Sequence, residues 1–299
     1  MSSEVRVVDT AAGLDFDPRA CPSLPPRTTI VMADPAYFDI EYVINPYMEG
    51  KEHSIDPTRA RTQWEALAQV YRHLGLTVEV VPPAPGLPDL VFVANQSFPA
   101  RRPDGRLVVL ISRMATSQRQ PEEAWFDHWY AEKGLETARL PGVAVFYEGM
   151  GDAEWLPGHQ LVFAGHGYRS DPQAWWALAR YLEVPVLRLR LVDPRFYHLD
   201  TCLQILAEDR ALYVPEAFDA SARDLLAAAI PHLVEVPLWE AVGGAACNGH
   251  CPDGTHYIVQ KENPETCARV RDLGFEPIEV DTSEFMKSGG SVYCLKLAM

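Results

Sequence analysis

An imidazole and a carboxylate stand close together in the segment FYHLDTC, residues 196–202. Side chains alternate along an extended strand, so a strand here would point His198 and Asp200 to one face and Leu199 to the other. Burying either polar group without a partner is costly. The pair therefore indicates a site where a proton carrier and an anion act side by side.

A cysteine near the last residues supplies a nucleophile. Cys294 lies in SGGSVYCLKL, where Gly289 and Gly290 allow a sharp turn or a close backbone approach just before it. The thiolate is the reactive form, and a free thiol has a pKa of ~8.5 that a neighbouring imidazolium or bound cation would lower. A lone buried cysteine is more often a core residue. Together with His198 as a proton shuttle, however, Cys294 predicts thiol catalysis.

Two more carboxylates occur in FYEGMGD, residues 146–152. Gly149 and Gly151 predict a loop in which Glu148 and Asp152 both turn inward, although Asp/Gly turns are also common on protein surfaces. In the functional interpretation, one carboxylate orients the histidine and the other binds a cation.

Two arginines are candidates to hold a substrate carboxylate. Arg113 lies in ISRMA and Arg169 lies in GYRSD. Either guanidinium has the fork geometry for two parallel hydrogen bonds to a carboxylate. Taken singly, each is more often a surface arginine.

The segment CNGHCPDGTH contains residue types that bind zinc. The spacing of Cys247, His250, Cys251 and His256 matches no standard four-ligand pattern, and a second cysteine pair at a distance is missing. We therefore expect a loop between strands here, and no metal site in the protein.

Short apolar runs that end in a polar residue recur about every fifty residues. Each interval contains one segment with helical signals, and a short β-like segment follows most of them. The unit is therefore strand, helix, strand, repeated five times. The runs end at Asn45, Asn95, Asp152, Asp200, Asn248 and Cys294, and the expected helices span residues 56–75, 121–134, 171–183, 219–230 and 263–274.

Units of this kind cannot bury their faces alone, so five of them are expected to close on one another. The fold class predicted is α/β, a five-bladed propeller with pseudo-fivefold symmetry, in which the polar ends meet in one central cleft. Residues 28–299 would form a single catalytic domain. Residues 1–27 lack periodicity and become rich in proline, which predicts a poorly structured arm.

The composition of the chain argues against some classes of binding partner. The chain has 299 residues, of which 47% are hydrophobic, and its net charge of −15 argues against a nucleic-acid partner. No apolar run resembles a membrane span or a signal sequence, so we expect no membrane partner. The six cysteines are widely scattered, which favours reduced thiols and a cytoplasmic protein. The sequence leaves open whether the chain forms a homo-oligomer.

Together these motifs resemble the guanidine-modifying superfamily, the penteins, from about residue 28 to 299. The resemblance rests on EGMGD, HLD and the cysteine that follows a glycine pair. It implies a five-bladed propeller and a catalytic set of Cys294 as nucleophile, His198 as acid and base, and Glu148 as the group that orients the histidine. It also implies that Asp200 grips a guanidinium and that arginines hold the α-carboxylate. We expect either Asp152 or Asn95 to help Asp200.

Within this superfamily, EYVINPYMEG, VFVANQSF and PRFYHLDTC are similar to the arginine dihydrolases. That resemblance implies conversion of arginine to ornithine, two ammonia and carbon dioxide, with no metal or organic cofactor and with Asn45 and Asn95 among the substrate-binding residues. Deiminases carry an aspartate where this chain has Asn95. An amide both donates and accepts hydrogen bonds, so it would suit a neutral ureido intermediate better than a second carboxylate would.

Three other enzymatic activities and one non-catalytic function are alternatives. Dimethylarginine hydrolysis and arginine deimination, which releases citrulline, would use the same catalytic set. Amidino transfer would require an acceptor amine. A propeller of this shape also serves as a non-catalytic binding protein, but the joint presence of Cys294, His198 and Glu148 argues against that function.

Overall fold

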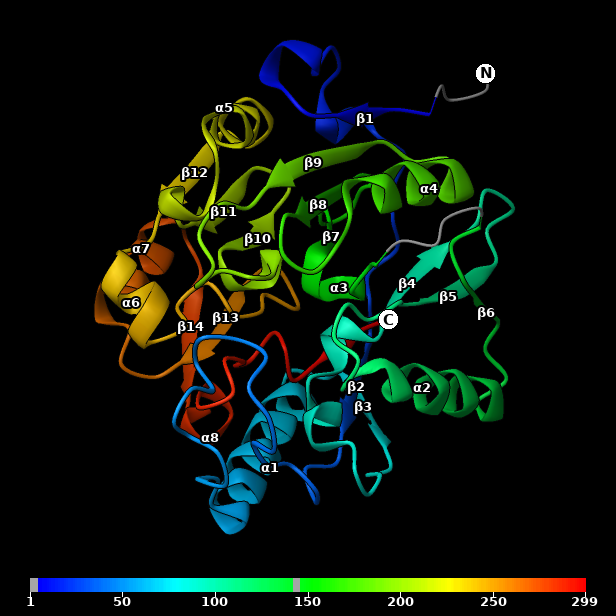
Figure 1. The fold of residues 1–299 in the computed structure, drawn as a ribbon. Coiled ribbons are helices and arrows are strands. Elements are labelled where there is room, and N and C mark those ends of the chain that lie inside the picture. Colours follow the sequence, from blue (N-terminus) through cyan, green and yellow to red (C-terminus); the bar gives the residue numbers. More distant parts are fainter. Residues whose placement is uncertain (1–4, 142–145) are drawn as a thin grey trace.

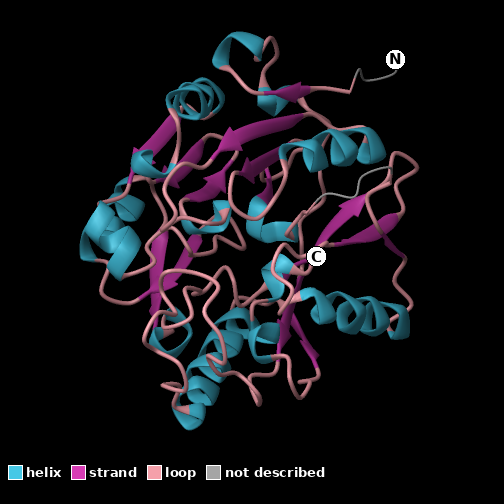
Figure 2. Ribbon diagram, viewed as in Figure 1, coloured by secondary structure: helices cyan, strands magenta, loops and turns pink. Residues whose placement is uncertain are grey.

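Within the described residues, five small β-sheets surround a common centre, and the longer helices lie on the outside of this ring (Figures 1 and 2). The computed structural model describes residues 5–141 and 146–299. The predicted five-bladed α/β arrangement is confirmed by these sheets. None of the helices within the described ranges is both long enough and apolar enough to cross a bilayer.

Each sheet contains one pair of parallel strands joined by an outer helix, which is the predicted strand–helix–strand unit. The five units are β2 (Thr29–Ala33), α1 (Pro57–His73) and β3 (Thr77–Val81); β5 (Leu107–Ile111), α2 (Gln120–Glu132) and β6 (Thr137–Ala138); β8 (Val162–His166), α4 (Pro172–Leu182) and β9 (Val186–Arg190); β11 (Arg210–Tyr213), α5 (Ala220–Ala229) and β12 (His232–Glu235); and β13 (His256–Gln260), α7 (Pro264–Asp272) and β14 (Glu276–Val280).

An antiparallel inner strand joins four of these pairs within the described residues. These inner strands are β4 (Ser97–Arg101), β7 (Ala153–Trp155), β10 (Leu203–Ala207) and β15 (Leu297–Ala298). In the fifth sheet a single bridge between His250 and Ile258 takes the equivalent place. The strand β15 pairs with β2, so the last strand of the chain completes the first sheet.

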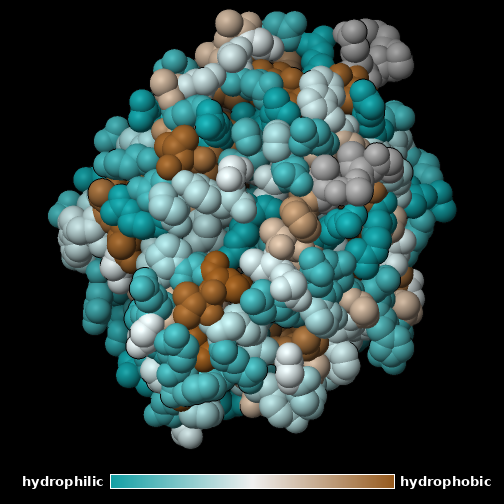
Figure 3. Space-filling view, viewed as in Figure 1, coloured by the Kyte–Doolittle hydropathy of each residue, from teal (hydrophilic) through white to brown (hydrophobic). Residues whose placement is uncertain are grey.

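The helix α1 illustrates why the helix predictions are correct. Asp56 caps its first turn by accepting hydrogen bonds from two backbone N–H groups, and Pro57 occupies the first helical position. On the inward stripe Trp64, Leu67 and Tyr71 are buried, as their helical spacing requires. The viewed face of the molecule is largely hydrophilic, with apolar residues in separate patches (Figure 3).

Asn95, Asp152, Asp200 and Cys294 lie in short turns or helices that precede the inner strands, and Asn45 lies in a loop before α1, which corrects the prediction that these residues end strands. Residues Val93–Asn95 and Leu199–Thr201 are single turns of 3₁₀-helix, named η4 and η5. The segment Gly149–Asp152 is a four-residue helix, α3, and not a loop. A 3₁₀ turn satisfies backbone groups locally and delivers a side chain to the centre just before the chain enters the strand.

The described part of the N-terminal arm is not loose. The strand β1 (Val7–Val8) pairs in parallel with β9, and Arg188 donates two hydrogen bonds to Asp9, at 2.6 and 2.7 Å. Two short 3₁₀ turns follow, η1 (Ala11–Gly13) and η2 (Pro18–Ala20). Residues 1–4 lie outside the described residues. The arm lacks periodicity because it adds one short edge strand and turns instead of a repeating unit.

Candidate active site

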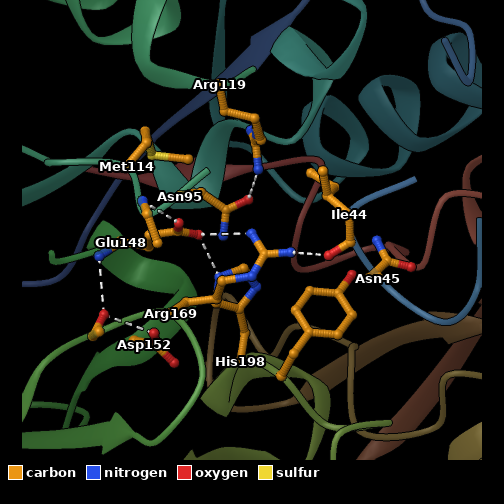
Figure 4. Close-up of polar contacts among 12 residues, drawn as sticks. Ile44, Asn45, Asn95, Met114, Arg119, Glu148, Asp152, Arg169 and His198 are labelled. Atoms are coloured by element: carbon orange, nitrogen blue, oxygen red, sulfur yellow. Dashed lines mark hydrogen bonds and ion pairs between the residues drawn. The ribbon is translucent and has the colours of Figure 1, made fainter. Parts of the chain in front are cut away.

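Side chains from turns and loops that join the strands and helices converge on one small cavity at the centre of the ring. Its volume is about 20 Å³, close to the space that one water molecule needs. The walls come from segments far apart in sequence, and Figure 4 shows several of them pointing toward one another. The lining residues are Ile44, Asn45, Met48, Asp89, Phe92, Asn95, Arg119, Arg169, Tyr197, His198, Ser288, Gly290 and Cys294.

Cys294 lies between an amide and a carboxylate. Its Sγ is 3.2 Å from Asp200 Oδ2 and 3.2 Å from Asn248 Nδ2, so the thiol donates to Asp200 and accepts from Asn248. Burial and then the charge of Asp200 raise the pKa of the Cys294 thiol well above its usual value. The free protein therefore holds a neutral thiol, which a positively charged ligand beside Asp200 would help to ionise.

His198 is held by Glu148. The ring Nε2 is 2.6 Å from Glu148 Oε2, and both side chains are buried. Burial alone would raise the pKa of Glu148, but the hydrogen bond from His198 and the charge of Arg169 lower it to about 2. Among the described residues no hydrogen bond joins His198 to Cys294, although both line the cavity. The histidine is thus oriented, and its partner remains ionised at neutral pH.

Asp200 presents an open acceptor. Its Oδ1 is buried and has no hydrogen-bond partner within residues 5–141 and 146–299. Burial is the main cause that raises the pKa of Asp200 to about 7. An unpartnered buried acceptor is costly. A donor-rich cation at this position would remove that cost.

Asp152 has a different environment from the one expected. Its Oδ2 accepts from Ser170 Oγ at 2.7 Å, and its Oδ1 accepts from the Leu199 backbone N–H at 3.0 Å. Burial raises its pKa to about 6. Asp152 therefore joins α3 to the turn that follows His198. It is not among the residues that line the cavity.

Arg169 lies at the cavity, whereas Arg113 does not. Arg169 Nη2 donates to the carbonyl oxygen of Ile44 at 2.8 Å, and Nη1 is 3.5 Å from Glu148 Oε2. Arg113 is exposed and lines a separate cavity on the outer side, beside Glu123. The structure therefore does not place Arg113 where the sequence predicts it, because its backbone pairs with Tyr147 in a bridge and its side chain points away.

The segment around Asn45 covers the cavity. Asn45 Nδ2 donates to the Ser288 carbonyl oxygen at 3.0 Å, and Ile44 is held by Arg169 as described above. Asn45 is therefore a bridge between this covering segment and the turn before Cys294.

Three residues at the cavity or in contact with Cys294 are missing from the sequence prediction. Asn248 ends one of the recurrent runs, so its position in the repeat was an available signal. Asp89 and Arg119 lie in segments without a repeat signal. Asp89 is buried with its Oδ2 unpartnered among the described residues, and burial raises its pKa. Arg119 binds the Asn95 side chain.

The zinc-like residue types do not gather into one site. His250 Nδ1 lies 3.2 Å from the Tyr71 hydroxyl, and His256 Nδ1 lies 2.7 Å from Asp253. A search of the described residues finds no group of three histidine, cysteine, aspartate or glutamate side chains that could hold a metal ion.

Position 151 has no room for a side chain larger than that of glycine. A Cβ added there would lie 2.2 Å from Asn95 Nδ2. We expect Gly151→Ala to displace the Asn95 amide and to destabilise the fold by about 1–3 kcal/mol, the usual cost of overpacking. Chemical denaturation measures this change. Gly243→Ala is the matched control because its Cβ would meet no atom within 4 Å. Equal stability of both variants would contradict the prediction.

This chain matches one family model and is similar in sequence to arginine dihydrolases and to a dimethylarginine dimethylaminohydrolase. Residues 34–298 match the family model described as N,N dimethylarginine dimethylhydrolase, eukaryotic. The bifunctional arginine dihydrolase/ornithine cyclodeaminase AgrE of a Nostoc species is 37% identical over 272 residues, which is 91% of this chain and 38% of AgrE. The N(G),N(G)-dimethylarginine dimethylaminohydrolase of Mycobacterium tuberculosis is 36% identical over 274 residues, 91% of this chain and 86% of that protein.

Solved structures of an arginine dihydrolase domain are also similar to this chain. The N-terminal domain of ArgZ, an arginine dihydrolase from cyanobacteria, superposes with a TM-score of 0.85 at 35% identity in a substrate-bound cysteine-to-serine variant. The match covers 90% of this chain and 97% of that domain. A product-bound form of the same domain gives a TM-score of 0.84. The chain thus spans 38% of the length of the bifunctional relative AgrE, and nearly all of the ArgZ N-terminal domain.

Proposed function

We propose that this chain, which belongs to the N,N-dimethylarginine dimethylhydrolase family, is a cysteine-dependent hydrolase. The proposed reaction converts L-arginine and two waters into L-ornithine, two ammonia and carbon dioxide. The observation that carries the proposal is the meeting of Cys294, His198 and the amide Asn95 in one buried cavity. Relatives named arginine dihydrolase support the choice of substrate.

Substrate binding would use the charges around the cavity. The guanidinium of arginine is a donor-only cation that suits the open Oδ1 of Asp200. The α-carboxylate would bind Arg169 in exchange for the Ile44 carbonyl oxygen, and the α-ammonium would bind the unpartnered Oδ2 of Asp89. This arrangement gives hydrogen-bond partners to Asp200 Oδ1 and Asp89 Oδ2, which have none among the described residues.

The first hydrolysis replaces one guanidino nitrogen by oxygen. The bound cation favours the Cys294 thiolate, which forms a bond to the guanidino carbon. His198 gives a proton to the departing nitrogen, ammonia leaves, and His198 then takes a proton from water. Hydroxide adds to the carbon, the carbon–sulfur bond breaks, and a ureido group and free Cys294 result.

The second hydrolysis releases ornithine. Cys294 attacks the ureido carbon, and His198 protonates the leaving side-chain nitrogen, so the bond between that nitrogen and the carbon breaks. A carbamoyl thioester remains on Cys294. Water hydrolyses it to carbamic acid, which decomposes to ammonia and carbon dioxide. In this proposal both hydrolyses use only the side chains described above and water.

Product analysis tests the proposal. The protein is incubated separately with arginine, citrulline and dimethylarginine, and the products are identified by mass. Ornithine with two equivalents of ammonia from arginine supports the proposal. Citrulline as the end product would show that only one hydrolysis occurs, and dimethylamine released faster than ammonia would favour the activity named for the Mycobacterium tuberculosis relative.

Arginine binding should depend on pH through Asp200. Protons and the guanidinium compete for this carboxylate, and the folded pKa of about 7 means that the free site is largely protonated below pH 7. Affinity should therefore fall about tenfold per pH unit below about 7 and level off above about 8. Calorimetric titration of arginine into Cys294→Ser measures it. The same variant with Asp200→Asn should bind weakly with a flat profile, and a slope that survives this change would contradict the role.

We also place the protein in the cytoplasm. The cysteines in the described part of the chain are all free thiols, which suits a reducing compartment.

A further inference from the structure

A second cavity lies at the opposite end of the ring from Cys294. The turns that carry Asp200 and Cys294 precede the inner strands β10 and β15, so the active-site cavity lies where these strands begin. The lining of the second cavity comes from the inner strands and from the hairpins that follow them, and it shares no residue with the first. Its volume of about 400 Å³ is in the range of small-molecule sites. We call it the far pocket.

Lys296 is a buried cation without a counter-ion at the far pocket. Only 1% of this residue is exposed, although it lines the pocket. Its Nζ lies 3.1 Å from the centre of the Tyr293 ring, and within the described part of the chain it makes no hydrogen bond or ion pair. Burial is the main cause that lowers the pKa of Lys296 to about 7. A ligand carboxylate would supply the missing partner and keep the ammonium charged.

Arg27 provides a second cation at the same pocket. Its guanidinium carbon lies 5.9 Å from the centre of the Trp155 ring, and no acidic side chain of the described ranges forms an ion pair with it. The charge of Arg27 helps to lower the pKa of Lys296, which shows that the two cations lie near each other. A guanidinium and an ammonium that both lack an acidic partner form a site for one carboxylate.

Gln204 presents a free acceptor in the far pocket. Its Nε2 donates to Glu154 Oε1 at 3.1 Å and to the Ile205 carbonyl oxygen at 3.0 Å, which directs the amide oxygen the other way. That oxygen is buried and has no partner among the described residues. Burial raises the pKa of Glu154 to about 8, although the charges of Lys296 and Arg27 oppose the rise. A cationic donor would satisfy the Gln204 oxygen and favour ionised Glu154.

The remaining lining of the far pocket is mainly apolar. It includes Trp155, Leu206 and the prolines Pro25, Pro157 and Pro252. An apolar group of the ligand would bury surface against these side chains. The pocket thus combines a place for a carboxylate, a place for a cationic donor and an apolar wall.

We propose that the far pocket binds a free α-amino acid with an apolar side chain. The ligand carboxylate would bind Arg27 and Lys296, and its α-ammonium would bind Gln204 Oε1 and Glu154. Its side chain would pack against Trp155. Since Lys296 is two residues from Cys294, such a ligand would contact the segment that carries the proposed nucleophile.

Calorimetric titration with L-phenylalanine tests the ligand class. The matched control ligands are 3-phenylpropionate, which lacks the ammonium, and 2-phenylethylamine, which lacks the carboxylate. We expect L-phenylalanine to bind with a Kd below about 1 mM and each control ligand to bind at least about tenfold more weakly. Absence of L-phenylalanine binding would overturn the inference. Equal binding of either control ligand would overturn it too, because one of the two charged groups would then have no partner in the site.

Variants distinguish the far pocket from the active site, which also binds an amino acid in the proposed reaction. Lys296→Met removes a buried charge that has no partner, and Arg27→Gln removes the second cation. Each should weaken L-phenylalanine binding at least about tenfold. Arg169→Gln, at the active-site cavity, should leave it unchanged. Binding that is lost in Arg169→Gln and kept in Lys296→Met would place the ligand in the active site and refute the proposal. If Lys296→Met does not fold, Arg27→Gln decides, and undiminished binding there refutes the proposal equally.

Discussion

Cys294→Ser should lower arginine consumption by about 10⁴-fold or more while the fold and arginine binding persist. The serine hydroxyl ionises far less readily than a thiol, and this site raises the pKa of the nucleophile further through burial and Asp200. The hydroxyl can still contact Asp200 and Asn248, so the surrounding turn keeps its partners. Ammonia release measures the rate, and calorimetric titration measures arginine binding.

Cys267 provides the matched control. It is a buried cysteine on the outer helix α7, far from the cavity lining. Cys267→Ala should retain nearly full activity. If Cys294→Ser kept more than about a hundredth of the wild-type rate, Cys294 would not be the nucleophile, because loss of a covalent nucleophile is not compensated at that level.

His198→Gln should lower the rate by about 10²–10⁴-fold, the usual contribution of a positioned acid and base. The loss should affect both proton delivery to ammonia and activation of water. A covalent adduct on Cys294 should therefore persist longer than in the unmodified protein. Rapid quenching followed by mass measurement of the intact chain detects it.

Glu148→Gln tests whether the negative charge of Glu148 assists His198 in catalysis. Its oxygen would still accept from His198, but the negative charge that stabilises an imidazolium would be gone. A smaller loss of rate is expected than for His198→Gln. His256→Gln, a histidine paired with Asp253 outside the cavity, should leave the rate unchanged. Rates equal to wild type in both His198→Gln and Glu148→Gln would exclude this pair from catalysis.

The repeat in the sequence predicts the architecture well because each unit carries its own local signals. A capping aspartate marks the start of α1 and α5, proline in the first turn marks α1, α2, α4 and α7, and buried apolar residues mark the inner side of all five helices. The recurrent polar positions then predict which residues meet. Asn95, Asp200, Asn248 and Cys294 do lie at equivalent places before inner strands or their counterpart.

The local shape of these turns is not readable from apolar patterning. The run YHLD has alternating polarity that suits a strand, but Leu199–Thr201 form a 3₁₀ turn because Thr201 and Cys202 bond back to His198 and Leu199. Such i to i−3 bonds leave no periodic signal in so short a segment.

The choice between Arg113 and Arg119 depends on tertiary contacts. Both follow the second sheet's strand β5 within a few residues, and both are arginines with no flanking motif. The buried carboxylate of Glu122, the side-chain oxygen of Asn95 and the carbonyl oxygens of Asp89, in η3 (Pro88–Val91), and Phe92 bind Arg119. Of these partners only Glu122 is near Arg119 in sequence, so apolar patterning and local motifs do not reveal the set.

The pairing of β15 with β2 has a consequence for protein synthesis. A ribosome builds the chain from the N-terminus, so β2 waits with an open edge until the final strand emerges. The reactive sulfur arrives only a few residues before that strand. A chain synthesised only as far as α8 (Ser283–Met286) therefore lacks both the strand that completes its first sheet and the sulfur proposed as the nucleophile, so the proposed activity requires synthesis through β15.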